Sequence, residues 1–141
     1  MRHLRQQLVK TVLAWEQSFC NAPSVTSALS EYDAALLIGM THEQYSEAVR
    51  GTTAVSRGTD FQFGGIRYQI KANRPSGKPG SPVTKVQKAR NYDWDKLIWI
   101  HYTSKYELHE AWEWEVDAYR TAFHMCKRLS PEDYRKGRKL K

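Results

Sequence analysis

Residues 60–71 have the sequence DFQFGGIRYQIK. Aromatic and β-branched residues lie on both sides of the glycine pair at positions 64–65. Two short runs of this kind joined by two glycines predict a β-hairpin with a tight turn. We therefore expect a sheet to begin here, and the patterns before and after the hairpin indicate what surrounds it.

The chain before the hairpin has helical periodicity. Within residues 3–19, apolar side chains recur at spacings of three and four, at Leu4, Leu8, Val12 and Trp15. This spacing is typical of an amphipathic helix. A second helix is predicted from residue 28 to a stop at Gly39, and a short third helix from Thr41 to just before Gly51.

The chain after the hairpin contains two further strand patterns. Residues 96–103 are a dense run of apolar and aromatic side chains, which predicts a buried central strand. Residues 106–115 alternate, which predicts a half-exposed neighbouring strand that pairs with the first. The alternation also predicts a solvated face for the acidic side chains, Glu107, Glu110, Glu113 and Glu115.

The C-terminal part is predicted to be helical and then basic. A helix is expected from Asp117, and Ser130 followed by Pro131 is typical of another helix start. We therefore expect an α/β fold, an α+β sandwich whose central mixed sheet of about four strands is flanked by helices. The length of 141 residues suits a single domain, 1–141. Its expected parts are a helical part, a sheet core, and a C-terminal helix with a basic tail, at residues 2–50, 58–116 and 117–141.

The composition indicates an intracellular protein with a polyanionic partner. The formal net charge is +7, and fixed positive charge attracts nucleic acid through counterion release. No apolar run is long enough to span a membrane. The cysteines, Cys20 and Cys126, have no CxxC spacing and the histidines no metal-binding spacing, which favours reduced thiols and disfavours a zinc site. We expect a cytoplasmic protein that binds DNA.

Residues 73–90 carry a one-sided excess of positive charge. The segment contains no acidic residue and five basic ones, Arg74, Lys78, Lys85, Lys88 and Arg90. Its prolines and glycines predict a loop whose backbone and cations contact DNA phosphates, and a mobile basic linker is the alternative. The loop lacks the GxxxxGK[ST] spacing of a phosphate-binding loop, so we expect no nucleotide cofactor.

Three polar residues of the hairpin suit phosphodiester hydrolysis. Asp60 begins one strand, while Gln69 and Lys71 lie two residues apart on the next strand and so point to the same face. Oxygen ligands bind Mg²⁺, and a cation beside them can act on the attacking water. The alternative is a structural ion pair between Asp60 and Lys71 that offsets the burial of a strand lysine.

Asp60 followed by Gln69-Ile70-Lys71 inside an apolar strand resembles the core motif of the PD-(D/E)XK nucleases, with glutamine in place of the usual second acid. The resemblance covers residues 31–103 and implies a restriction-endonuclease-like core. It implies Mg²⁺ as cofactor, with Mn²⁺ as a possible substitute. In that family an acidic residue on the helix before the hairpin commonly completes the site.

Glu31 is the candidate for this helix acid, with Asp33 and Glu47 as alternatives. The resemblance then implies that the metal is held by Glu31, Asp60, Gln69 and the Ile70 carbonyl. Lys71 would orient or deprotonate the attacking water.

The expected function is a metal-dependent DNA endonuclease of the restriction or repair type. Cleavage of both strands would favour a homodimer with two sites, because a chain of this size reaches one scissile phosphate at a time. Two alternatives stay open: a non-catalytic DNA-binding module on the same fold, and a basic protein-interaction domain.

Overall fold

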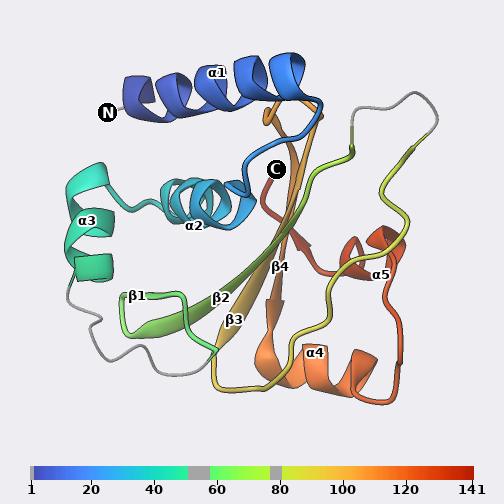
Figure 1. The fold of residues 1–141 in the computed structure, drawn as a ribbon. Coiled ribbons are helices and arrows are strands. Elements are labelled where there is room, and N and C mark those ends of the chain that lie inside the picture. Colours follow the sequence, from blue (N-terminus) through green and yellow to red (C-terminus); the bar gives the residue numbers. More distant parts are fainter. Residues whose placement is uncertain (1, 51–57, 77–80) are drawn as a thin grey trace.

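The computed structural model describes residues 2–50, 58–76 and 81–141. Three helices precede the sheet, and two short helices follow its fourth strand (Figure 1). The helices are α1 (Arg2–Phe19), α2 (Thr26–Leu37), α3 (His42–Arg50), α4 (Val116–Phe123) and α5 (Pro131–Tyr134). The strands are β1 (Phe61–Phe63), β2 (Ile66–Asn73), β3 (Lys96–Tyr102), β4 (Leu108–Glu115) and β5 (Arg138–Lys139). None of the helices in this part of the chain is both long and apolar enough to cross a membrane.

The strands form one mixed sheet in the order β1-β2-β3-β4-β5. β2 and β3 are parallel and the other neighbours are antiparallel, so the mixed α/β class is confirmed. β3 lies in the middle, where its apolar sequence predicted it. The sheet has one strand more than expected, because residues 138–139 of the predicted basic tail pair with β4. Edge strands tolerate charged side chains, so the positive charges of the tail did not indicate that it contains a strand.

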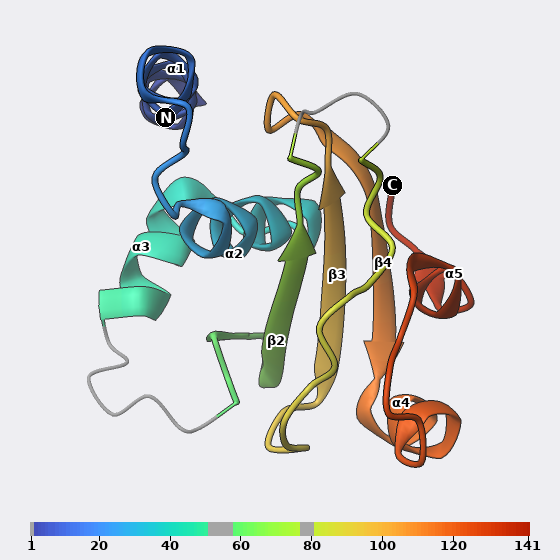
Figure 2. The ribbon, with the colours of Figure 1, turned by 45° about the vertical axis from the view of Figure 1, so that its right-hand side comes forward.

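Helices cover both faces of the sheet. α1, α2 and α3 lie on one side and α4 and α5 on the other (Figure 2). Successive β3 residues alternate between two cores: Ile98 and Ile100 pack beneath α2, whereas Leu97 and Trp99 pack towards Tyr119 and Tyr134. Side chains two apart on β2, such as Gln69 and Lys71, consequently share a face.

Local signals account for most of the predicted boundaries. The hairpin turn has positive φ at Gly64 and Gly65, as a tight two-residue turn requires. α2 ends before Gly39, whose φ of 98° continues the chain in the left-handed region. Thr41 and Gln44 exchange hydrogen bonds at the start of α3, which is a capping box.

The prediction that the acidic side chains of β4 lie on a solvated face is wrong in part. Glu110 and Glu113 are buried, and Glu107 and Glu115 are exposed. Glu110 is paired with Arg135 and His101, and Glu113 with Lys96 and Arg138. Glu110 and Glu113 lie on opposite faces of β4. Arg135, directly after α5, covers Glu110, and cations of β3 and β5 cover Glu113, so both acids are removed from the solvent to which the prediction assigned them.

The link between β2 and β3 contains no helix among its described residues. It is held instead by single contacts: Val86 forms a β-bridge with Leu129, and the Ala89 N–H donates to the Tyr119 hydroxyl at 2.9 Å. The Tyr134 hydroxyl donates to the Gln87 carbonyl at 2.6 Å. An irregular segment is therefore fixed against the α4–α5 side of the sheet.

Candidate active site

The candidate site lies where the outer edge of β2 becomes open. β1 pairs with β2 only through residues 66–68. Asp60 directly precedes β1, and its N–H donates to the Tyr68 carbonyl at 2.8 Å. One step along β2, the Ile70 N–H donates to Asp60 Oδ2 at 2.7 Å. The carboxylate thus takes the place of the missing strand and is held at a fixed point on this edge.

A pocket of about 290 Å³ opens beside this edge. It is lined by α2, by the start of the hairpin, by β2 and by the β2–β3 link. The lining residues are Thr26, Ser27, Ser30, Glu31, Asp60, Gln69, Ile70, Lys71, Ala72 and Gln87. All the predicted catalytic residues, and Ile70, therefore meet in one cavity, although Glu31 is 29 positions before Asp60.

Glu31 is the helix acid that reaches the pocket. Of the two alternatives, Asp33 is buried elsewhere, where it accepts hydrogen bonds from Arg5 and Tyr102. Glu47 is exposed on α3 and does not line the pocket. Two neighbouring acids on one helix therefore differ completely in environment, because positions 31 and 33 face different directions on α2.

The Gln69 amide bridges two oxygen atoms of the pocket. Its Nε2 donates to Asp60 Oδ2 at 2.9 Å and to the Ile70 carbonyl oxygen at 3.3 Å. Both acceptors are among the ligands that the family resemblance implies for Mg²⁺. The positively polarised NH₂ group of Gln69 lies between these two oxygens, so its position suits a cation. Rotation of the amide would present the Gln69 oxygen at the same position as a third ligand. Two carboxylates, an amide and a carbonyl form an all-oxygen set, so the residues fit Mg²⁺.

Burial disfavours the charged form of both carboxyl groups in the pocket. Burial, the negative charge of Asp60 and a hydrogen bond to Asp60 raise the pKa of Glu31 to about 7. Burial also raises the pKa of Asp60, although its hydrogen bonds from the Ile70 N–H and with Glu31, and the charge of Lys71, act in the opposite direction. Their charges also raise the pKa of Tyr45 to about 12, after the larger effect of its own burial. The site holds negative charge that its own cations do not balance.

Lys71 lies in the same pocket without a direct ion pair. Burial lowers the pKa of Lys71, the charge of Asp60 raises it, and the positive charge of Arg90 lowers it again. In the described part of the chain no salt bridge joins Lys71 to Asp60. The geometry therefore gives no support to a structural Asp60–Lys71 bridge, and it leaves the ammonium group available within the pocket.

The five basic residues of the loop have different environments. The Arg74 guanidinium is almost fully buried, where it pairs with Glu16 at 2.9 Å, donates to the Ser104 carbonyl and lies 4.2 Å from the Tyr106 ring centroid. Lys88 Nζ donates to two carbonyls at the end of α4, those of His124 and Cys126, both at 2.9 Å. These contacts argue against phosphate binding by Arg74 and Lys88 and indicate structural roles.

Lys85 and Arg90 are the loop cations that stay exposed. Arg90 is close enough to lower the pKa of Lys71, so its charge acts on the pocket. Lys78 lies outside the described residues.

Sequence reasoning missed Gln87. Its side chain is exposed at the pocket, while its carbonyl is held by Tyr134 and its neighbour Val86 is buried against Leu129. The signal that could have indicated Gln87 is a polar residue between two apolar positions, 86 and 89, which are buried. The nearby prolines concealed this signal, because they indicate a loop. Thr26, Ser27 and Ser30 were missed as well, because hydroxyl residues at or near the start of a helix usually serve only as caps.

No three of the described His, Cys, Asp and Glu residues cluster as a metal site. The set described above contains two such residues, and its other ligands are an amide and a carbonyl. No protein-family model matches the chain, and no curated protein matches it either.

Proposed function

We propose that this protein is a Mg²⁺-dependent DNA endonuclease of the PD-(D/E)XK type that hydrolyses phosphodiester bonds in the pocket of Glu31, Asp60, Gln69 and Lys71. The observation that carries the proposal is the convergence of these four side chains, from α2, the hairpin start and β2, on one cavity at the open edge of the sheet. Restriction or repair is the expected role, and a cytoplasmic location suits the two free cysteines.

Each residue has a distinct task in this proposal. Asp60, Glu31, the Gln69 amide oxygen and the Ile70 carbonyl would hold Mg²⁺, which when bound supplies positive charge to the scissile phosphate and to a water molecule. The unbalanced negative charge of Glu31 and Asp60 favours binding of a divalent cation. Lys71 would orient the attacking water and stabilise the charge that builds up on the phosphate oxygens.

DNA binding would depend on cations outside the pocket. The net charge of +7 provides long-range attraction, and the β2–β3 link carries exposed Lys85 and exposed Arg90, whose charge acts on Lys71 in the pocket. Binding and chemistry therefore use separate residues. This separation makes the proposal testable, because each can be removed without the other.

The test is incubation of supercoiled and linear DNA with the protein in Mg²⁺, Mn²⁺ or EDTA. We expect cleavage with either metal and none in EDTA. Lys71→Ala should abolish cleavage while DNA affinity and the far-UV circular dichroism spectrum stay unchanged, and Lys105→Ala, at an exposed turn position, is the control. DNA binding without cleavage in any metal would identify a non-catalytic DNA-binding module. Absence of both would favour a protein-interaction domain.

A further inference from the structure

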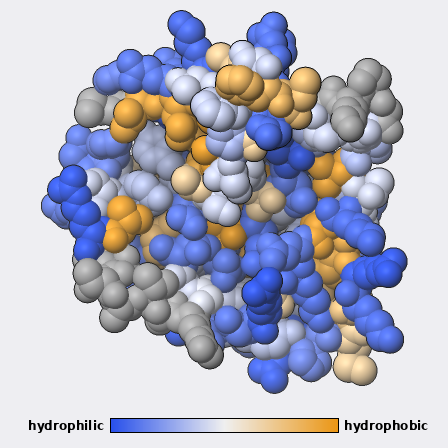
Figure 3. Space-filling view, in the orientation of Figure 1, coloured by the Kyte–Doolittle hydropathy of each residue, from blue (hydrophilic) through white to orange (hydrophobic). Residues whose placement is uncertain are grey.

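The N-terminal helices leave an apolar face uncovered. Six large apolar side chains are exposed in the described part of the chain, and five of them lie on two helices, four on α1 and one on α3. They are Leu4 (57% exposed), Leu8 (39%), Trp15 (49%), Phe19 (61%) and Val49 (38%). The predicted stripe of α1 therefore points largely outward, and apolar atoms gather over α1 in Figure 3. Such a concentration is uncommon on a monomer and marks a contact surface.

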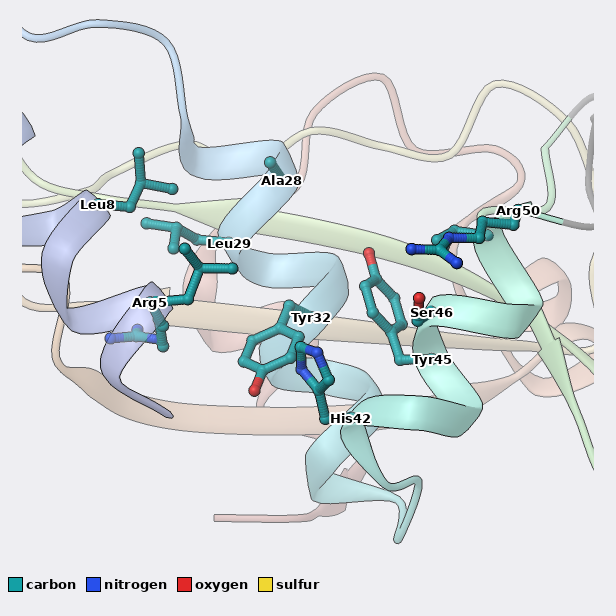
Figure 4. Close-up of a pocket in the computed structure, with 11 residues that line it drawn as sticks. Arg5, Leu8, Ala28, Leu29, Tyr32, His42, Tyr45, Ser46 and Arg50 are labelled. Atoms are coloured by element: carbon teal, nitrogen blue, oxygen red, sulfur yellow. The ribbon is translucent and has the colours of Figure 1, made fainter. Parts of the chain in front are cut away.

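A groove lies beside this stripe. It has a volume of about 340 Å³ and runs between α1, α2 and α3. Leu8 of α1 lies on one side, Tyr45 of α3 on the other, and Leu29 and Tyr32 of α2 between them (Figure 4). Leu4 and Val49 also line the groove. The molecule thus presents a protruding apolar ridge and an apolar groove next to one another on the same face.

Neither helix is well buried within one chain. α3 has nine residues and none of them is buried, and on α1 only Val12 is buried among residues 3–19, whose burial the structure describes. Helices of nine residues are not stable in water without tertiary packing. α3 is packed mainly through Tyr45, which contacts Tyr32 and Phe61 edge to face. A partner surface that contacts both α1 and α3 would bury the exposed apolar side chains of the two helices.

We infer that this face binds a second copy of the same chain, with the α1 ridge of each copy in the groove of the other. A two-fold contact needs a ridge and a matching groove on one surface, which is what α1 and α3 present.

The apolar area is of the size that a dimer requires. A large aromatic side chain carries roughly 150–250 Å² of surface, so the five partly exposed side chains offer on the order of 400–500 Å² per copy. A standard interface buries about 800 Å² per partner, of which slightly more than half is apolar. The inference rests on packing alone and does not depend on the proposed nuclease activity.

The test is the mass of the full chain in solution by analytical ultracentrifugation, from about 1 to 100 µM. We expect twice the 16.4 kDa of one chain at the upper concentrations. Leu4→Lys with Leu8→Lys should raise the dimer dissociation constant at least about 30-fold, since buried anchor residues contribute most of the binding energy. Met125→Lys, at an 89% exposed position outside this face, adds a lysine and should leave the constant unchanged.

Trp15 provides an independent readout. Iodide quenching of its fluorescence should decrease as the protein concentration rises, and this decrease should disappear in Trp15→Phe. The far-UV circular dichroism spectrum of the double lysine variant shows whether its helices are retained. A single-chain mass at every concentration would overturn the inference. So would a dimer that the folded double variant forms as tightly as the parent, since the contact would then lie elsewhere.

Discussion

Two carboxylate sites, one on β4 and one between α2 and the start of the hairpin, have opposite electrostatics. Glu110 on β4 accepts hydrogen bonds from Arg135 at 2.7 Å, from Trp112 at 2.7 Å and from His101 at 3.0 Å. These donors hold its pKa at about 2. In the pocket of Glu31 and Asp60 the carboxyl groups face one another, and the pKa of Glu31 is about 7.

The difference separates an acid that stabilises the fold from acids that are free to bind something else. The oxygens of Glu110 are saturated by donors from the chain, so a cation or substrate would have to displace Arg135. Glu31 and Asp60 are partly buried with too little positive charge nearby, and the cost of ionising them there is offset when an external cation binds. The two sites should therefore respond differently to matched amino-acid substitutions.

The largest expected difference is in catalysis. Asp60→Asn should lower the cleavage rate by about 10³-fold or more, because a metal ligand loses its charge. Glu110→Gln removes a charge of the same sign from the other site and should leave the cleavage rate of the folded protein within a few-fold of the parent. Single-turnover cleavage of one DNA duplex measures both, and equal losses in the two variants would contradict the assignment.

The next difference is in stability. Arg135→Leu leaves Glu110 buried without its main partner and should lower the free energy of unfolding by about 2–3 kcal/mol, a value discounted because Arg135 is partly exposed. Lys71→Met removes a half-buried cation that has no direct ion pair, and should cost less than about 1 kcal/mol. Urea unfolding of both variants is the measurement. A larger loss in Lys71→Met would show that Lys71 has a structural role.

The pH dependence of stability should differ in sign. The folded-state pKa of Glu31 is raised, so its contribution to stability is fully present below its usual pKa of 4.5 and is lost as pH rises through about 7. That of Glu110 is lowered, so its contribution is present above 4.5 and is lost as pH falls towards 2.

Glu31→Gln should therefore raise the thermal midpoint by a few degrees at pH 8.5 and change it little at pH 4. Glu110→Gln should lower the midpoint at pH 7 and have little effect near pH 2. Thermal melts in buffers across this range measure both variants. A midpoint of Glu31→Gln below that of the parent at pH 8.5 would show that the carboxylate stabilises the fold.

The smallest expected difference is in DNA affinity. Arg90→Ala, beside the pocket, should weaken binding to all sequences alike and lower the slope of log K against log salt by about 1. Lys136→Ala removes an exposed cation on the α5 side and should leave the slope unchanged. Fluorescence anisotropy across a salt series gives both slopes. Equal slopes in the two variants would place the DNA on another face.

Local patterns accounted for the hairpin, the central strand and the ends of α2 and α3. Gly64 and Gly65 adopt the positive φ that a tight two-residue turn requires, and alternation along β2 places Gln69 and Lys71 on one face. Arg74 shows the limit of this reasoning. Its basic, acid-free neighbourhood predicted a phosphate contact, but Glu16 and Tyr106, distant in sequence, bind its guanidinium.

The amino-acid pattern alone was sufficient for the fold class, for β3 at the centre of the sheet, and for Asp60, Gln69 and Lys71 as neighbours, because strand and turn geometry repeats over a few residues. Tertiary contacts were needed to separate Glu31 from Asp33, to bury Glu110 beneath Arg135, to hold Gln87 at the pocket and to turn the α1 stripe outward. Burial and ion pairing depend on which distant segments pack together, and periodicity within one segment carries no information about them.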